Sequence, residues 1–172
     1  MRFEQITPGD IDRVFDILEK SFPVDEYRPL EQQKALILAK KYTVYALYDG
    51  DSLVGFISVW DLATVAYVEH LAVALEHRGK GHGSMLLREL SMLLKKRICL
   101  EVEPPLTSEA TRRIAFYRRN GFYLNSYPYL QPAYSQDRQA VPLLLMTTQA
   151  PLTQTEFDDV KSLLYHEVYQ AF

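Results

Sequence analysis

The residues with the clearest chemical character lie in one short segment. Three basic side chains alternate with three glycines after an expected strand, and a serine closes the run: Arg78, Gly79, Lys80, Gly81, His82, Gly83 and Ser84. Because a helical period begins at Gly81, the segment is predicted to be a turn at a helix N-terminus. Unbonded N–H groups and the helix dipole favour an anion there, and glycines let its oxygens approach the backbone. The segment therefore predicts a phosphate-binding loop.

Two common phosphate-binding motifs fit this spacing poorly. A P-loop ends in Gly-Lys followed by Ser or Thr, and no lysine stands between Gly81 and Ser84. A dinucleotide fingerprint needs a third glycine where Ser84 stands, and its acidic residue could come only loosely from Glu101 or Glu103. A protein that binds a nucleotide through this loop remains an alternative function.

Two blocks of sequence resemble one known superfamily. The pattern Arg78-x-x-Gly81-x-Gly83, after the strand Glu69-His-Leu-Ala-Val73, resembles the acetyl-CoA signature of the GNAT superfamily of N-acetyltransferases. The block Arg113-Ile-Ala-Phe-Tyr-Arg-Arg-Asn-Gly-Phe122 resembles its downstream motif, in which a helix ends in aromatic-Tyr, three residues and Gly-Phe. The match covers Tyr67 to Phe122. It implies an acyltransferase that moves an acetyl group from acetyl-CoA to a primary amine of a small molecule or peptide.

The resemblance also implies which residues bind the cosubstrate, acetyl-CoA. The strand before the loop would pair its backbone with the pantetheine arm, and the loop would hold the pyrophosphate. The implied residues are Leu71, Ala72, Val73, Arg78, Gly79, Lys80, Gly81, His82, Gly83, Ser84 and Phe116. Where many members carry an asparagine early in the second helix, this chain has Ala110 and Thr111, so a polar contact near the cofactor is missing or replaced.

Two residues are expected to carry the chemistry. Tyr117 matches the residue that often protonates the leaving thiolate in the superfamily; the alternative is a core tyrosine with a satisfied hydroxyl. Strand alternation places Glu69 on one face with Leu71, and His70 on the other unless a bulge intervenes. Glu69 is expected to take the proton of the amine directly or through a water, and a solvated or salt-bridged carboxylate is the alternative. Glu101 and Glu103 are further candidate bases.

The acceptor site is expected in the less family-like parts of the chain. One segment runs from Ser21 to Arg28 with Asp25 and Glu26, and the other runs from Ser126 to Ala140 with Tyr127, Tyr129 and Tyr134. Aromatic walls beside a carboxylate would suit an amine with an apolar or cationic body. A non-catalytic CoA-binding module of the same fold is the alternative function, because a fold does not guarantee its chemistry.

Composition narrows the class of protein and its partners. The chain has 172 residues, 48% hydrophobic and 24% charged, with a net charge of -3, which is typical of a globular domain and argues against nucleic acid as a partner. A single cysteine, Cys99, excludes an internal disulfide, and four scattered histidines predict no metal site. The absence of a signal-like segment or a long apolar run predicts a cytoplasmic protein without membrane contact. A homodimer is left open.

Hydrophobic periods predict one α/β domain over residues 1–172 with the order βααβββαβαββα. The resemblance implies a GNAT-like fold, a central, mostly antiparallel sheet that splays at the strand before the glycine-rich loop and is flanked by helices. The ranges expected are a strand Met1–Ile6, a helix capped by Thr7, a helix Pro29–Lys41, strands Tyr42–Tyr48, Leu53–Trp60 and Thr64–Val73, a helix Gly81–Lys96, a strand Ile98–Val102, a helix Ser108–Asn120, strands from Phe122 and over Val141–Thr147, and a helix after Thr153. The helix Gly81–Lys96 is expected to carry an apolar stripe of Leu86, Leu87, Leu90, Leu93 and Leu94. Gly121 is expected to end the helix before it in the left-handed conformation, and a capping box of Thr153 and Glu156 is expected to open the last helix.

Overall fold

A computed structural model describes residues 1–171 and has the element order that the sequence predicts. The elements are β1 (Arg2–Gln5), α1 (Ile11–Ser21), α2 (Leu30–Leu36), β2 (Tyr42–Asp49), β3 (Ser52–Asp61), β4 (Ala66–Val73), α3 (His82–Leu94), β5 (Ile98–Val102), α4 (Ser108–Arg119), β6 (Phe122–Gln131), β7 (Val141–Thr148) and α5 (Gln154–Glu167). The strands form a mostly antiparallel sheet in the order β1-β2-β3-β4-β5-β7-β6. The predicted mixed α/β class is confirmed.

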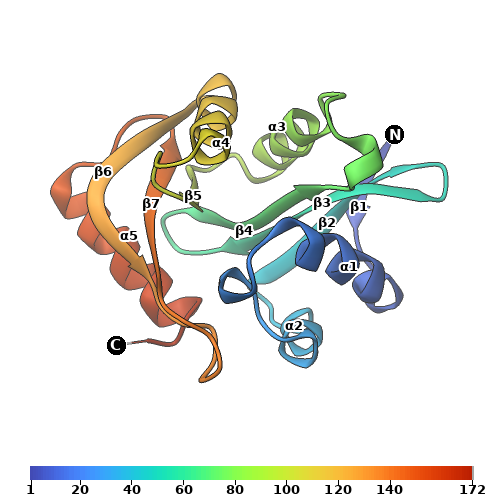
Figure 1. Cartoon of the computed structure of the whole chain (residues 1–172), viewed down its shortest axis with the longest axis horizontal. Helices are drawn as coiled ribbons and strands as arrows, with labels where there is room; N and C mark the ends of the chain where they lie inside the picture. The colour runs from blue at the N-terminus through green and yellow to red at the C-terminus, as the bar shows by residue number, and fades with distance from the viewer. Residues whose placement is uncertain (172) are drawn as a thin grey trace. The chain divides into compact units, whose positions relative to one another are not determined.

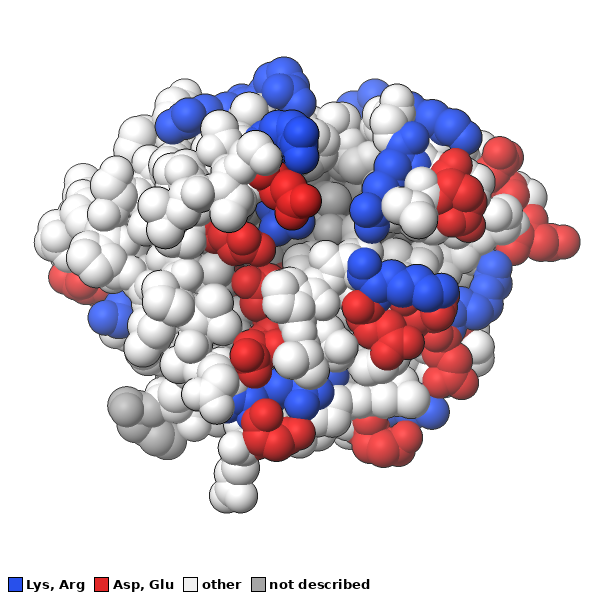
Figure 2. Space-filling model, viewed as in Figure 1, with Lys and Arg blue, Asp and Glu red and all other residues white. Residues whose placement is uncertain are grey.

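The chain divides into two compact units. The first comprises residues 1–61 and 68–95, and the second comprises residues 62–67 and 96–171 of the described chain. Within residues 1–171, no helix combines the length and apolar character needed to cross a bilayer. Lysine and arginine are interspersed with aspartate and glutamate on the face seen in Figure 2.

The first unit is built on the ladders of β1 to β3 and most of β4. Figure 1 shows α1 and α2 on one side of these strands and α3 on the other. Both α1 and α3 pack against β3, whose residues between its two ends are all buried. The apolar stripe of α3 supplies Leu86, Leu87 and Leu90 to this core. Burial on both faces explains why β3 reads as a nearly continuous apolar run.

The second unit is built on β5, β7 and β6, which pair antiparallel in that order. Helix α4 packs on β5 and β6, and α5 packs on β6. Helix α5 begins at the predicted capping box, since Thr153 accepts from the N–H of Glu156 and Glu156 accepts from the N–H of Thr153. Cys99 of β5 is buried, and burial raises the pKa of its thiol.

Three predicted details are wrong. Helix α2 ends at Leu36 rather than Lys41, because the next hydrogen bonds span only three residues. Strand β6 continues to Gln131, so Tyr127 and Tyr129 lie in a strand rather than in a connection. Pro128 looks like a loop residue in sequence, but the register of β6 shifts between Asn125 and Tyr129, and such irregularities admit proline. Leu93 was expected to point inward from α3 and is 53% exposed.

One close approach between strands depends on a missing side chain. A Cβ atom on Gly55 of β3 would lie 2.7 Å from the carbonyl oxygen of Ala72 and 3.1 Å from the Cα atom of Val73 in β4. Both neighbours are backbone atoms, which cannot rotate away. Only glycine therefore lets β3 lie this close to the part of β4 that precedes the glycine-rich loop.

We expect Gly55→Ala to lower the free energy of unfolding by roughly 1 to 3 kcal/mol, the usual cost of overpacking a core. Thermal unfolding followed by circular dichroism would measure the change. Gly9→Ala is the matched control, because a Cβ atom there would meet only the Oγ1 atom of Thr7 at 3.7 Å, an ordinary contact. Equal melting temperatures for the two variants would contradict the assigned role of Gly55.

Candidate functional site

The glycine-rich loop is a tight turn that leads directly into α3. Gly79 and Gly81 have φ angles of 74° and 81°, in the left-handed region where residues with a Cβ atom are strained. Gly81 is the N-cap residue of α3, and its carbonyl accepts the first helical bond from the N–H of Met85. The N–H groups of the first turn, from His82 onward, have no partner within the helix and can serve an anion.

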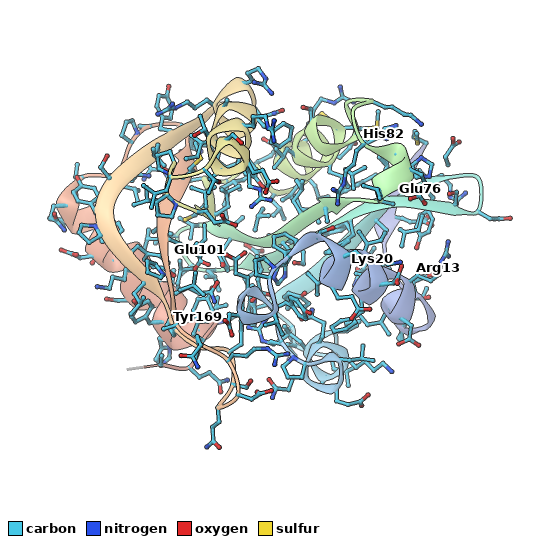
Figure 3. All side chains as sticks on the ribbon, viewed as in Figure 1. Arg13, Lys20, Glu76, His82, Glu101 and Tyr169 are labelled. Atoms are coloured by element: carbon cyan, nitrogen blue, oxygen red, sulfur yellow. The ribbon has the colours of Figure 1, made fainter. Side chains whose placement is uncertain are left out.

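Three basic side chains hold this loop in shape by donating to main-chain carbonyls that precede it. The Nε of Arg78 donates to Val73 O at 3.0 Å, and the Nζ of Lys80 donates to Glu76 O at 3.2 Å. The Nδ1 of His82 lies 3.1 Å from His77 O, and because a carbonyl can only accept, Nδ1 carries the proton. His82 is buried, with 9% of the residue exposed. Figure 3 labels His82 at the start of α3 and Glu76 in the segment before the loop.

Arg78 also connects the loop to the end of α1. Its Nη2 donates to the Oγ of Ser21 at 3.1 Å. The side chain lines an open hollow of about 890 Å³ between α1 and the segment after β4, together with Ile17, Lys20 and Leu75. Figure 3 shows Lys20 and Arg13 on the α1 side of this region. The guanidinium of Arg78 is thus oriented by fixed acceptors while the residue stays exposed to solvent.

Strand β4 is partly exposed at alternate residues before the loop. Glu69, Leu71 and Val73 are partly exposed, whereas His70 and Ala72 between them are buried. The side chain of Glu69 has an exposed fraction of 0%, so the exposed part of this residue is its main chain. Accessible backbone in an extended strand can pair with a ligand that carries amide groups.

The carboxylate of Glu69 forms a buried ion pair. The Nη1 of Arg28 donates to Oε1 of Glu69 at 2.6 Å, and the exposed fractions of the two side chains are 8% and 0%. The guanidinium of Arg28 also lies over the Trp60 ring, 5.8 Å from its centroid. Arg28 belongs to the connection between α1 and α2, so this pair fastens the connection to β4.

His70 fastens the same connection from the next position of β4. Its Nε2 lies 2.7 Å from the carbonyl oxygen of Glu26, and its ring meets Phe22 edge-on with centroids 4.9 Å apart. Alternation predicted that His70 would face away from Glu69, yet its Nδ1 lies 3.9 Å from Oε2 of Glu69. The N–H of His70 donates to the Oγ of Ser58, a side chain of β3, at 3.0 Å.

Burial makes His70 a source of acid sensitivity. The pKa of His70 lies below its ordinary value of 6.5, chiefly because burial disfavours the charged ring; Arg28 adds to this effect, whereas Glu69 and the Glu26 carbonyl oppose it. A histidine with a lowered folded-state pKa takes up its proton more readily in the unfolded chain. Its contribution to stability is complete above about pH 6.5 and is lost as the pH falls toward the folded-state pKa.

We therefore expect the unfolding free energy to decrease below about pH 6.5, and this decrease to be smaller in His70→Gln. Glutamine keeps an amide N–H that can reach the Glu26 carbonyl but does not titrate. Urea unfolding from pH 5 to pH 8 would measure the slope for both proteins. His166→Gln is the control, because it makes the same substitution at an exposed histidine of α5. Identical slopes for the parent and His70→Gln would count against this role.

In the second unit, Tyr117 lies on α4 beside Phe116. Tyr117 is 8% exposed, and its ring packs edge-on against Phe116 and Phe122, with centroids 5.1 Å and 5.5 Å away. Burial raises the pKa of Tyr117 to about 12, although Arg113 opposes this effect. The hydroxyl makes no hydrogen bond within the described part of its own unit. A neutral tyrosine of this kind can donate a proton.

A second carboxylate, Glu101 of β5, is surrounded by tyrosines. Tyr129 donates to its Oε1 at 2.5 Å, and Tyr169 contacts Oε1 and Oε2 at 2.8 Å and 2.9 Å. The hydroxyl of Tyr67 lies 3.0 Å from that of Tyr169. Burial and the charge of Glu101 raise the pKa values of Tyr129 and Tyr169, so both stay neutral donors. Figure 3 labels Glu101 and Tyr169.

The structure thus groups the predicted site residues within each unit. The first unit holds Glu69, Leu71, Ala72, Val73 and the loop from Arg78 to Ser84, and the second holds Phe116 and Tyr117. Glu103, the other candidate base, lies 3.3 Å from Arg113 through its Oε1. Among residues 1–171, no cluster of three or more His, Cys, Asp or Glu side chains is arranged to hold a metal ion.

Two residues that contact the carboxylates of Glu69 and Glu101 were not predicted from the sequence. Arg28 was named only as the end of a connecting segment, and Tyr169 was not singled out. Neither lies in a recognisable motif, and each contacts a carboxylate that is 41 or 68 residues away in the chain. No local signal in the sequence could have found them.

Comparison with known proteins defines the family. Residues 40–124 match the family model described as an acetyltransferase (GNAT) domain. A solved structure from Bacteroides thetaiotaomicron, described as an acetyltransferase of the GNAT family, is 34% identical with a TM-score of 0.90, and the alignment covers 100% of both chains. The chain belongs to the GNAT family of acetyltransferases.

Two more distant structures share the fold. The ribosomal-protein-S18-alanine N-acetyltransferase from Escherichia coli is 18% identical with a TM-score of 0.67, over 88% of this chain and 95% of that chain. A chimera of the spermidine N-acetyltransferase SpeG from Vibrio cholerae and hSSAT is 17% identical with a TM-score of 0.64, over 86% of this chain and 95% of that chain. A search of curated protein sequences gives no match.

Proposed function

We propose that this protein transfers the acetyl group of acetyl-CoA to a primary amine of a small molecule or peptide. The observation that carries the proposal is the loop from Arg78 to Ser84, where left-handed glycines and braced basic side chains surround the unbonded N–H groups of α3. Family membership supports acyl transfer. The two named distant structures act on spermidine and on the alanine of ribosomal protein S18, and both of these acceptors are amines.

In the proposed reaction the first unit binds the cosubstrate. The loop N–H groups and Arg78 hold the pyrophosphate through charge-assisted hydrogen bonds. The main chain of Leu71 and Val73, two partly exposed residues, pairs with the amide groups of the pantetheine arm, and Ala72 anchors the strand between them. An N–H group near Leu71 stabilises the negative charge that develops on the thioester oxygen.

Tyr117 is the proposed proton donor to the departing thiolate. Its raised pKa keeps the hydroxyl protonated near neutral pH, and its hydroxyl is not consumed by a partner within its own unit. The amine nitrogen attacks the thioester carbonyl, the C–S bond breaks, and the sulfur takes the proton of Tyr117.

Glu69 is the proposed base, and it takes the proton of the amine indirectly rather than by direct contact. Because its side chain has no exposed surface, the proton lost by the amine reaches it through a hydrogen-bonded carrier such as a water. The ion pair with Arg28 fixes the position of the carboxylate. The same burial favours the alternative function, a CoA-binding module without catalysis, in which this pair is purely structural.

An acetyl-CoA turnover screen over a library of amines separates these two functions. We expect release of CoA with at least one class of primary amine and none with alcohols of similar shape. Tight binding of acetyl-CoA without turnover of any amine would support the CoA-binding module instead.

We expect Arg78→Ala to weaken acetyl-CoA binding by about 1.5 to 3 kcal/mol, the range for a charge-assisted hydrogen bond. Gly81→Val should abolish binding, because valine cannot adopt the left-handed backbone of this position without strain. Isothermal titration calorimetry would measure both. Arg88→Ala is the control, since Arg88 is an exposed arginine of α3 outside the loop. Unchanged affinity in both loop variants would refute the assignment.

We expect Tyr117→Phe to lower kcat by roughly 10- to 1,000-fold with little change in acetyl-CoA affinity, because the hydroxyl acts only as the C–S bond breaks. Steady-state kinetics with an acceptor from the screen, together with a melting curve, would test this. Tyr123→Phe, at a tyrosine of β6 that is 46% exposed, serves as the control. A normal kcat combined with a lower melting temperature would show that Tyr117 is a structural core residue.

A further inference from the structure

Strand β1 is the edge strand of the sheet, and the backbone N–H and C=O groups on its outer side point away from β2. Arg2, Phe3, Glu4 and Gln5 pair with β2, and the register continues to Ile6, whose N–H donates to Val44 O at 3.0 Å. Bonded and non-bonded pairs alternate in an antiparallel ladder. Arg2 and Glu4 therefore turn their N–H and C=O groups toward β2, whereas Phe3 and Gln5 turn theirs outward.

A groove lies beside this edge in the same unit. It has a volume of about 440 Å³ and runs between β1 and the last turns of α3; Phe3, Tyr45, Met92 and Leu93 form its apolar part, and Glu4, Gln5 and Glu89 complete its lining. Phe3 stacks on Tyr45 with ring centroids 5.2 Å apart, while Met92 and Leu93 are 55% and 53% exposed. Neighbouring apolar residues exposed along a sheet edge mark a surface for association.

If two copies of β1 are related by a two-fold rotation, the charged side chains of one copy can lie opposite the opposite charges of the other copy. Arg2 and Glu4 lie on the same face of the strand, 3.5 Å apart, with side chains 54% and 51% exposed. If a second β1 ran antiparallel with Phe3 opposite Phe3 of the second copy, Arg2 would face Glu4 of that copy, twice by symmetry. Opposite charges across strands stabilise pairing.

The neighbouring registers are less favourable. Placing Phe3 opposite Gln5 of the second copy would bring the two Glu4 carboxylates face to face, and like charges directly opposite are destabilising. Placing Gln5 opposite Gln5 would leave Arg2 and Glu4 without their opposite charges. A two-fold axis at Phe3 also uses the outward N–H and C=O groups of both copies.

We propose that the β1 edge and the adjoining groove bind a second copy of this chain, so that two sheets join through antiparallel β1 strands with Phe3 at the two-fold axis. Met92 and Leu93 of both copies then cover an apolar seam beside the joined strands. This inference concerns assembly alone, and it holds whether or not the chain transfers an acetyl group to an amine.

A register-specific disulfide tests the pairing. In a hydrogen-bonded antiparallel pair the Cα atoms lie about 5.5 Å apart, within the range of a disulfide. Phe3→Cys should therefore give covalent dimers under mild oxidation. Gln5→Cys is the matched control, because the two Gln5 positions would be roughly 14 Å apart in this register. The native Cys99 is buried and should not contribute. Equal cross-linking of both variants, or none in Phe3→Cys, would overturn the proposal.

Charge reversal tests the same register without a cross-link. Sedimentation velocity of the full chain over a range of concentrations should show a dimer. Arg2→Glu and Glu4→Arg should each weaken it by about tenfold, because each places like charges opposite each other twice. The double variant should restore it. A monomeric parent chain, or single variants that dimerise as well as the parent, would overturn the proposal, and melting curves of each variant would verify that the monomer stays folded.

Discussion

The buried ion pair between Arg28 and Glu69 is the interaction on which the arrangement of the first unit depends. Removing one partner of such a pair leaves a charge without compensation in a dry environment and typically costs about 3 to 5 kcal/mol. The pair joins the connection between α1 and α2 to β4, and His70 adds a hydrogen bond to the Glu26 carbonyl one residue further along. The segment expected to form part of the acceptor site is thus fixed by two consecutive residues of the strand expected to bind the pantetheine arm.

Hydrogen bonds to main-chain carbonyls also fix the side chains of the glycine-rich loop. Arg78 and Lys80 would repel each other if both were free to converge on an empty anion site. Arg78, Lys80 and His82 instead each donate to a main-chain carbonyl of the segment from Val73 to His77, so all three side chains are held before a ligand arrives. A site organised in this way does not lose the conformational freedom of those side chains on binding.

Much of the fold was predictable because its signals are local. The β-branched and aromatic residues of β2 and β3, the capping box at Thr153 and the left-handed Gly121 each act over a few residues, and the elements that they predict were confirmed. The loop from Arg78 to Ser84 was predictable for the same reason, since glycine spacing fixes its backbone. Pro128 misled because a strand irregularity, which the sequence does not encode locally, admits it within β6.

The surroundings of the two carboxylates could not be predicted, because they depend on contacts between distant segments. Glu69 is enclosed by a residue from the α1–α2 connection, and Glu101 by tyrosines from β6 and from the segment after α5. Strand alternation predicts the face of the sheet on which a side chain lies, but it does not predict which residues from distant segments pack over that side chain.

The burial of Cys99 has a practical consequence for following acetyl transfer. A thiol reacts with electrophilic dyes as its thiolate, and a thiol that is both enclosed in β5 and shifted to a high pKa offers very little thiolate at neutral pH. Free CoA carries an exposed thiol. A thiol-reactive chromophore added to the folded protein would therefore report the CoA released by turnover against almost no background from the protein itself.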